Sequence, residues 1–149
     1  MWQIDFLKIE DYPMVYRLWL ETKGLGLNRM DDSREGIEKY LNRNPGTCFI
    51  AKSENQVLGT ILSGHDGRRG FIYHLAVAEP FRHQGIGKAL VNRAVGALKN
   101  QGIKKVAFVV YKRNKGANHF WDKLGFGERK DLFYRDKIIG NEEIQGIDT

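Results

Sequence analysis

A glycine-rich segment in the middle of this 149-residue chain combines residue types that could bind an anion. Residues 82–90 read RHQGIGKAL and stand where a strand pattern changes into a helical one. At the start of a helix the backbone N–H groups lack intrahelical partners, and the helix dipole is positive there. Glycines let a phosphate approach such a backbone closely, and Arg82 and Lys88 add positive charge. The segment therefore predicts a site for a pyrophosphate.

Two familiar glycine-rich signatures fit this segment poorly. A dinucleotide-binding fingerprint needs a third glycine where Leu90 stands and an acidic residue about 20 positions further on. No acidic residue occurs between Glu79 and Asp122. A Walker phosphate loop needs Ser or Thr after its lysine, but Lys88 is followed by Ala89. We therefore expect neither signature here.

The segment instead matches the pattern Arg/Gln-x-x-Gly-x-Gly/Ala, with Arg82, Gly85 and Gly87 at its defined positions. A second motif follows downstream and reads Asn-x-x-Ala-x-x-aromatic-aromatic-x-x-Leu-Gly-Phe. Its residues here are Asn114, Ala117, Phe120, Trp121, Leu124, Gly125 and Phe126. By these two motifs, their separation and the order of the predicted elements, residues 1–139 resemble the GNAT superfamily of acetyl-coenzyme A (acetyl-CoA) dependent N-acetyltransferases, in particular its small single-domain microbial members.

The resemblance implies acetyl-CoA as co-substrate. In such proteins the strand before the glycine loop splays away from its parallel neighbour, and the pantetheine arm lies in the opening against strand backbone. The diphosphate lies on the glycine loop, and the asparagine of the second motif contacts the cofactor from the far side. The cofactor-binding residues implied for this sequence are Leu75, Ala76, Val77, Arg82, His83, Gln84, Gly85, Ile86, Gly87, Lys88 and Asn114.

The implied reaction is direct attack of a primary amine on the thioester within a ternary complex. A backbone N–H near Leu75 is the expected donor to the oxyanion. Because an alkyl amine has a pKa of about 10.4, it is mostly protonated at neutral pH and a base must remove a proton. His74 is our candidate base, since histidine titrates near neutral pH and this one precedes the cofactor-binding strand segment. Tyr73, expected on the opposite face of the strand, replaces it if the register shifts by one residue.

Two positions depart from the family pattern. Many members carry a tyrosine in the second motif that protonates the departing thiolate, but that position is Trp121 here, and an indole N–H is no practical acid. Tyr111 or Tyr134 could take this role, or the thiolate, with a pKa of about 8.5, could take a proton from water. Val109 stands where enzymes that acetylate ribosomal-protein N-termini carry a glutamate, which disfavours that substrate class.

These residues need a scaffold, and the hydrophobic pattern predicts one. Strands are expected over residues 4–9, 47–52, 57–63, 70–77, 105–111 and 132–139. Helices are expected from about residue 13 to 24, 32 to 44, 85 to 102 and 117 to 124. Asp11 is the expected N-cap of the first helix, and Asp32 with Glu35 has capping-box spacing for the second.

This order of elements predicts an α/β (α+β) fold. Consecutive hairpins make most of the sheet antiparallel, whereas a strand, a helix and a further strand imply a right-handed crossover and a parallel pair. We therefore expect a mixed, mostly antiparallel central sheet flanked by helices. In the GNAT fold that the sequence resembles, this parallel pair is the splayed one.

The net charge points to the glycine loop as well. The chain has 24 Lys and Arg against 18 Asp and Glu, a formal charge of +6. Nine of the basic residues lie between Glu79 and Asp122, which leaves 15 basic against 18 acidic residues elsewhere. The diphosphate and 3′-phosphate of one CoA molecule would account for this local surplus. The slightly acidic remainder suits a cationic amine acceptor, either a small molecule or a peptide.

Two other functions stay open at this stage. The pI of about 9.5 and the aromatic content could indicate a nucleic-acid-binding module, and residues 69–71 open like an RNA-recognition strand. Ile72 stands where that strand needs a small residue, and no row of aromatic platforms accompanies the basic residues, so we expect no nucleic-acid partner. A CoA-binding homologue with a regulatory role and no catalysis is the other alternative, prompted by Trp121.

Length and composition predict one soluble domain, residues 1–149, with a polar tail at 140–149 that frays. No apolar stretch reaches the roughly 20 residues that span a bilayer, so no membrane contact is expected. Cys48 has no disulfide partner and the first residues lack a secretory pattern, which favours the cytoplasm. No side chains have metal-ligand spacing, so no metal is expected. A homodimer through the C-terminal strands would match proteins that this one resembles.

The acceptor side is expected to be walled by two loops, residues 24–32 and 64–69. Glu21, Asp31 and Asp32 are candidates to attract an amine there, and helix capping and solvation are the competing roles for these side chains. His119 of the second motif is expected on the protein surface rather than in catalysis.

Overall fold

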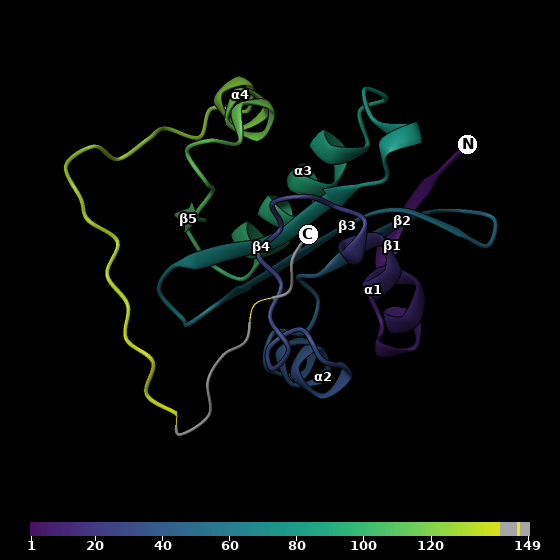
Figure 1. Ribbon diagram of the computed structural model, residues 1–149, viewed down its shortest axis with the longest axis horizontal. Coiled ribbons are helices and arrows are strands. Elements are labelled where there is room, and N and C mark those ends of the chain that lie inside the picture. Colours follow the sequence, from purple (N-terminus) through teal and green to yellow (C-terminus); the bar gives the residue numbers. More distant parts are fainter. Residues whose placement is uncertain (141–145, 147–149) are drawn as a thin grey trace.

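The computed structural model describes residues 1–140 and residue 146, and a five-stranded sheet lies at its centre (Figure 1). The strands are β1 (Gln3–Phe6), β2 (Phe49–Ser53), β3 (Gln56–His65), β4 (Gly70–Val77) and β5 (Val106–Ala107). They lie side by side in chain order. Neighbouring strands are antiparallel except β4 and β5, which are parallel. The mixed, mostly antiparallel sheet predicted from the sequence is confirmed.

Helices cover both faces of this sheet (Figure 1). They are α1 (Tyr12–Leu20), α2 (Arg34–Arg43), α3 (Ile86–Asn100) and α4 (Lys115–Lys123), with short 3-10 helices at Ile9–Asp11 and Glu79–Phe81. α1 and α2 pack on one face, and α3 and α4 pack on the other. Because parallel strands cannot be joined by a tight turn, α3 serves as the crossover between β4 and β5.

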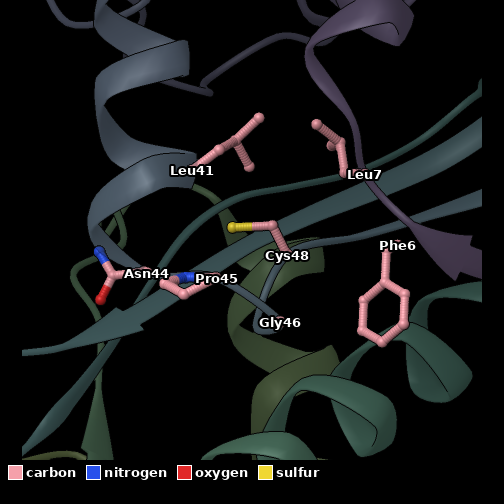
Figure 2. A pocket seen from close by; sticks show the side chains of 7 residues that line it. All are labelled: Phe6, Leu7, Leu41, Asn44, Pro45, Gly46 and Cys48. Atoms are coloured by element: carbon pink, nitrogen blue, oxygen red, sulfur yellow. The ribbon is translucent and has the colours of Figure 1, made fainter.

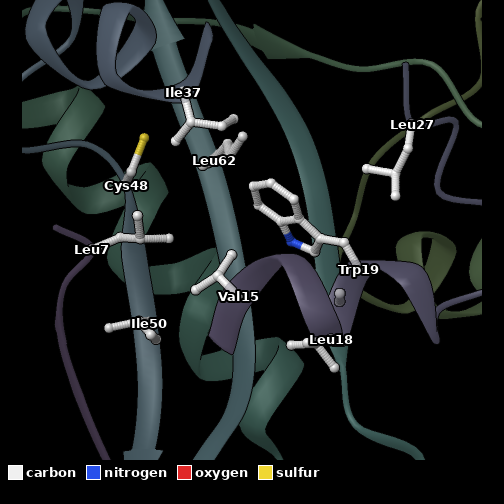
Figure 3. Close-up of a cluster of buried hydrophobic side chains, with 10 residues drawn as sticks. Leu7, Val15, Leu18, Trp19, Leu27, Ile37, Cys48, Ile50 and Leu62 are labelled. Carbon is white, nitrogen blue, oxygen red and sulfur yellow. The ribbon is translucent and has the colours of Figure 1, made fainter. Parts of the chain in front are cut away.

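Each face of the sheet has its own hydrophobic core. Figure 3 shows the core under α1 and α2, where the fully buried Trp19 packs with Ile50 and Leu62 of the sheet. On the opposite face Leu90 of α3 is buried with Ile61 of β3. Burying one such side chain contributes about 1.5–3 kcal/mol. The two cores therefore fix β3 and β4, the strands that carry the candidate base and its neighbours.

A β-bulge interrupts β4 at the candidate base. The pairing between β3 and β4 shifts between Thr60 and Leu62, so that one residue of β3 lies opposite two residues of β4, His74 and Leu75. His74 adopts a φ of +48°, a left-handed backbone conformation that is uncommon for residues other than glycine. Residues at a bulge leave the regular ladder, and the carbonyl of His74 accepts a hydrogen bond from the Thr60 hydroxyl.

β4 and β5 are a splayed pair, as the sequence resemblance implies. They pair only where Gly70 meets Val106 and Phe71 meets Ala107. The expected strand over residues 105–111 is therefore wrong beyond residue 107. Phe108 leaves the ladder and stacks on Trp121 of α4, with ring centroids 4.0 Å apart, so side-chain packing against α4 replaces strand pairing there.

The expected last strand, residues 132–139, does not form. These residues belong to no helix or strand, and after α4 the chain runs away from the sheet (Figure 1). Their large apolar side chains are exposed: Leu132, Phe133, Tyr134, Ile138 and Ile139. A strand needs a neighbour to complete its hydrogen bonds, and no described residue pairs with this segment. Of the tail expected to fray, residues 141–145 and 147–149 lie outside the described residues.

Two acidic residues do not cap helices as expected. Ser33, not Asp32, caps α2, because its hydroxyl accepts a hydrogen bond from the N–H of Gly36 at 3.0 Å. Asp11 stands at the N-cap position of α1, as expected, but its carboxylate makes no hydrogen bond to that helix. It accepts one from the N–H of Lys8 and lies 2.8 Å from Nζ of Lys52. Both carboxylates thus form tertiary contacts that local spacing alone did not indicate.

Candidate active site

The glycine loop exposes a continuous run of unpaired backbone donors. No hydrogen bond joins the N–H groups of residues 83–88 to another described residue. His83 and Gly85 adopt positive φ values of 66° and 85°, and α3 begins at Ile86 without a side-chain cap or an acidic residue in its first turn. Successive N–H groups in such turns form concave anion sites, and a helix N-terminus reinforces them. This arrangement has the chemistry of a phosphate-binding site.

The residues around the loop join it to β4 and α4. Arg82 donates a hydrogen bond from Nε to the carbonyl of Val77 at 3.0 Å, which ties the loop to the end of β4. Gly87 faces Phe120, whose ring atoms would lie 3.2 Å from a Cβ at this position. The partly buried side chains of Leu75 and Val77 pack against the hydrophobic core that includes α3.

Asn114 links the second motif to the loop after α1. Its Oδ1 accepts a hydrogen bond from the N–H of Ala117 at 3.1 Å and so caps α4. Its Nδ2 lies beside Gly24, where a Cβ would approach it to 3.3 Å. The asparagine predicted to contact the cofactor therefore lies between α4 and the loop expected to wall the acceptor side.

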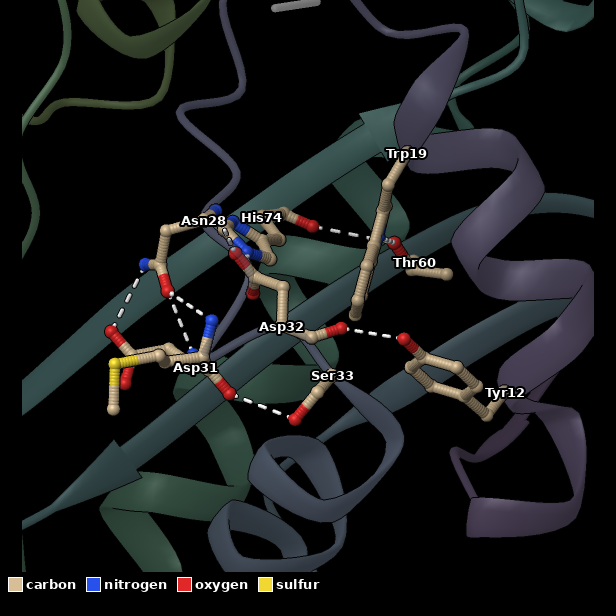
Figure 4. A network of polar contacts seen from close by, with 9 residues as sticks. Tyr12, Trp19, Asn28, Asp31, Asp32, Ser33, Thr60 and His74 are labelled. Atoms are coloured by element: carbon tan, nitrogen blue, oxygen red, sulfur yellow. Dashed lines mark hydrogen bonds and ion pairs between the residues drawn. The ribbon is translucent and has the colours of Figure 1, made fainter. Parts of the chain in front are cut away.

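The side chain of the candidate base forms a hydrogen bond with a residue from that loop. Nε2 of His74 lies 2.5 Å from Oδ1 of Asp32 (Figure 4). The two side chains are 9% and 4% exposed. The other carboxylate oxygen of Asp32 accepts a hydrogen bond from the N–H of Asn28 at 2.8 Å, and its carbonyl accepts one from the Tyr12 hydroxyl at 2.6 Å. Asp32 is thus held from three sides in contact with the imidazole.

The backbone of His74 is anchored on its other side. Nε1 of Trp19 donates to Oγ1 of Thr60 at 2.9 Å, and this hydroxyl donates to the carbonyl of His74 at 3.3 Å (Figure 4). The indole of Trp19 also meets the imidazole edge-on, with ring centroids 4.9 Å apart. Side chain and main chain of the candidate base are therefore both fixed.

Tyr73 does not lie on the opposite face from His74, and that prediction was wrong. Both rings lie on the α1 and α2 side of the sheet, because the bulge places consecutive residues on one face. Tyr73 is 46% exposed and meets Tyr40 of α2 edge-on. Partial burial, Tyr134 and Asp31 raise its pKa, in that order of effect, so Tyr73 is a neutral phenol at physiological pH.

Of the remaining residues singled out in the sequence, two are exposed and one is buried. Tyr111 is exposed on the α4 side, and the Arg113 guanidinium lies 4.1 Å from the centre of its ring. His119 is exposed, as expected. Trp121 is buried in an aromatic cluster with Phe108 and Phe126 and serves as core. Tyr111 is therefore the member of this motif region whose side chain is accessible to a ligand.

A shallow hollow of about 310 Å³ lies away from these residues (Figure 2). Its lining includes Cys48 and the loop that follows α2, and no acidic or basic side chain. Burial raises the pKa of the Cys48 thiol to about 12, so the thiol stays protonated and unreactive. Among the described residues there is no cluster of possible metal ligands, and none of their helices is long and apolar enough to cross a bilayer.

Comparison with known proteins agrees with the fold and the loop. The family described as "Acetyltransferase (GNAT) family" matches residues 12–126, which include β4, the glycine loop and the second motif. This match spans most of the chain, and the protein belongs to that family of acetyltransferases. An acetyltransferase of Photorhabdus laumondii is 31% identical over 143 residues, covering 95% of this chain and 99% of the relative.

Solved structures show the same architecture. The PaiA N-acetyltransferase of Thermoplasma acidophilum, solved with coenzyme A, has a TM-score of 0.74 at 22% identity over 85% of this chain and 90% of that one. An aminoglycoside acetyltransferase from an uncultured soil metagenomic sample, solved with sisomicin, has a TM-score of 0.71 at 25% identity over 92% and 97%. The predicted family and its fold are confirmed.

Sequence reasoning missed the contact between Asp32 and His74. The capping role expected for Asp32 is wrong, because Ser33 caps α2, and the Asp32 carboxylate instead contacts the imidazole of His74. The two residues lie 42 positions apart on unrelated elements, and no local pattern links them. The one available signal was that Ser33 is an equally good N-cap, which leaves Asp32 free for another contact.

Proposed function

We propose that this protein is an N-acetyltransferase that moves the acetyl group of acetyl-CoA to a primary amine by direct attack within a ternary complex. The observation that carries the proposal is the continuity of β4: a histidine paired with a buried carboxylate sits at its bulge, and its end leads into the donors of residues 83–88. The candidate base therefore lies on β4, and the candidate anion site follows the end of the same strand.

In this proposal the cofactor follows β4 into the glycine loop. The backbone of residues 75–77 holds the pantetheine arm in the splayed opening, where β5 offers no pairing. The N–H groups of residues 83–88 hold the diphosphate, with Arg82 and Lys88 beside it. Asn114 contacts the cofactor from the opposite side. The complex of the Thermoplasma acidophilum relative with coenzyme A supports a CoA ligand for this fold.

The chemistry balances with one base and solvent. The acceptor ammonium gives a proton to His74, which passes it to solvent, and the neutral nitrogen attacks the thioester carbon. The N–C bond forms and the C–S bond breaks, while a backbone N–H at the bulge, near Leu75, donates to the oxyanion. The nitrogen then loses its second proton, and the thiolate takes one up from water or from Tyr111, whose own proton solvent restores. Each turnover releases one net proton.

The acceptor is proposed to be a cationic small molecule or peptide amine. The sisomicin complex of the metagenomic relative supports an amine acceptor for this fold, and outside residues 80–121 the chain is slightly acidic. We also propose that residues 1–149 form one domain, that the protein acts in the cytoplasm without a metal or nucleic acid, and that it forms a homodimer. The exposed apolar segment 132–139 supports the dimer.

Two measurements test the proposed function. A melting-temperature shift is expected with acetyl-CoA and none with RNA, and a panel of amines assayed by free-thiol release should yield acceptors. His74→Ala should reduce turnover about 10²- to 10⁴-fold while leaving the acetyl-CoA shift intact. A protein that binds acetyl-CoA but releases no thiol with any amine would be a regulatory CoA-binding homologue. The absence of any shift with acetyl-CoA would reject both.

A further inference from the structure

Among the described residues, Asp32 is the one charged side chain hydrogen-bonded to the imidazole of His74. The titratable side chains around this contact are Tyr73 of β4 and Tyr12 of α1, whose hydroxyl donates to the Asp32 carbonyl. The pKa values of both tyrosines are raised, mainly by burial, so both are neutral at physiological pH. Asp31 and Arg34 lie close enough to act on these tyrosines: Asp31 also raises the pKa of Tyr73, and Arg34 lowers that of Tyr12. Trp19 covers the remaining face of the imidazole with an uncharged ring.

This contact determines where the imidazole proton lies. An ionised carboxylate only accepts hydrogen bonds, so in the neutral imidazole the N–H must be on Nε2, which leaves Nδ1 as the acceptor. No hydrogen bond from a described residue reaches Nδ1. No buried side-chain nitrogen or oxygen in the described residues lacks a partner, so Nδ1 is not sealed from solvent. The ring nitrogen that has no hydrogen-bond partner among the described residues is therefore the one able to take a proton.

We propose that Asp32 is a positioning residue for the transferase reaction: it holds His74 in the Nε2–H tautomer, so that Nδ1 accepts the proton of the acceptor amine. The inference rests on the proposed function, in which His74 is the base. Asp32 further stabilises the imidazolium that forms when Nδ1 is protonated, because the two charges lie in contact in a largely buried site.

The surroundings of Asp32 make one isosteric substitution diagnostic. In Asp32→Asn the N–H of Asn28 still needs an acceptor, so the amide oxygen turns toward it and the NH₂ group faces Nε2. An NH₂ group only donates, so Nε2 has to accept and the ring proton moves to Nδ1. The variant should therefore keep its fold and lose its proton-accepting atom.

Asp11 offers a matched control for the loss of a buried carboxylate. One of its oxygens lies 2.8 Å from Nζ of Lys52 and the other accepts a hydrogen bond from the N–H of Lys8 at 3.0 Å, so Asp11, like Asp32, contacts one side-chain nitrogen donor and one backbone donor. It lies at the start of α1, outside the proposed machinery. Asp11→Asn should lower the melting temperature as Asp32→Asn does and leave turnover unchanged.

The tautomer of His74 can be determined without an amine substrate. Two-bond ¹H–¹⁵N correlation spectra of histidine-labelled protein, at a pH where His74 is neutral, should show Nε2 protonated in wild type and Asp11→Asn, and Nδ1 protonated in Asp32→Asn. His74→Gln identifies the signal. A wild-type ring protonated on Nδ1, or an unchanged tautomer in Asp32→Asn, would overturn the inference.

Turnover gives the second readout. With an acceptor from the amine panel, Asp32→Asn should reduce kcat/KM about 10²- to 10⁴-fold, and should cause no further loss in a His74→Gln background, because it acts through that ring. A further loss of similar size in that background would show a general structural role and overturn the inference. Full activity of His74→Gln would instead reject the proposed base. An inactive His74→Gln with a fully active Asp32→Asn would reject only the role of Asp32.

Discussion

Gly85 and Gly102 flank α3 in the same backbone conformation, with φ values of +85° and +87°, and a Cβ on either would meet nothing within 4 Å. Alanine at either position therefore imposes the same left-handed strain, about 1 kcal/mol, without a clash inside the protein. Of the two glycines, only Gly85 belongs to the run of unpaired donors. Comparing alanine substitutions at both positions therefore separates the effect of backbone strain from the loss of cofactor binding.

Gly85→Ala should abolish or strongly reduce the melting-temperature shift with acetyl-CoA, because its Cβ projects into the space proposed for the diphosphate. Gly102→Ala should lose comparable stability in the absence of ligand and keep the full shift. Thermal denaturation with a series of acetyl-CoA concentrations measures both. Equal shifts in the two variants would mean that the diphosphate lies elsewhere.

Thr60→Val should lower the free energy of unfolding by about 1–3 kcal/mol, since it leaves the buried Nε1 of Trp19 and the carbonyl of His74 without their shared hydroxyl. Thr22→Val is the control. The hydroxyl of Thr22 only donates to the carbonyl of Leu18, so its removal leaves no buried N–H group without an acceptor. Urea denaturation of the two variants should show the larger loss at Thr60. The reverse order would contradict the proposed anchoring of the bulge.

Cys48 should make the fold sensitive to alkali. Burial raises the pKa of its thiol from 9.0 to about 12, so the unfolded chain loses this proton first and unfolding becomes more favourable as pH rises. The free energy of unfolding should fall between pH 9 and 12 and be unaffected by this thiol below pH 9. Cys48→Ala removes that slope while retaining the contribution of the tyrosines, so denaturant titrations of both proteins at several pH values isolate it.

The exposed segment 132–139 should control self-association. Phe133 is 91% exposed, and we expect Phe133→Asp to shift the protein from dimer to monomer in light scattering coupled to size-exclusion chromatography. Met14→Asp replaces an exposed apolar side chain on α1 and should leave the dimer intact. A monomeric wild-type protein would reject the proposed homodimer and leave the transferase proposal untouched.

The parts of the fold that local patterns specify could be predicted closely. The strand over residues 70–77 occurs with the expected bounds, and α3 begins one residue after Gly85. Alternating and helical hydrophobic periods, together with glycine, are properties of neighbouring residues. The glycine loop could be predicted for the same reason, since its donors and charges come from one short segment.

Residues 105–111 and 132–139 are the segments whose predicted strands are wrong in part or in whole. Both read as strands from their composition, yet only residues 106 and 107 pair with β4. A strand depends on a partner that completes its hydrogen bonds, and the availability of that partner is not written in the segment itself.

By itself, then, the sequence determined the family, the mixed sheet and the place of the glycine loop before α3, because these follow from short motifs and hydrophobic periods. The tertiary structure alone decided which atoms surround the candidate base. The bulge in β4 placed Tyr73 and His74 on one face, and the packing of the loop before α2 brought Asp32 to Nε2. Such contacts depend on how distant elements pack, and a one-residue change of register would have turned the same side chains away.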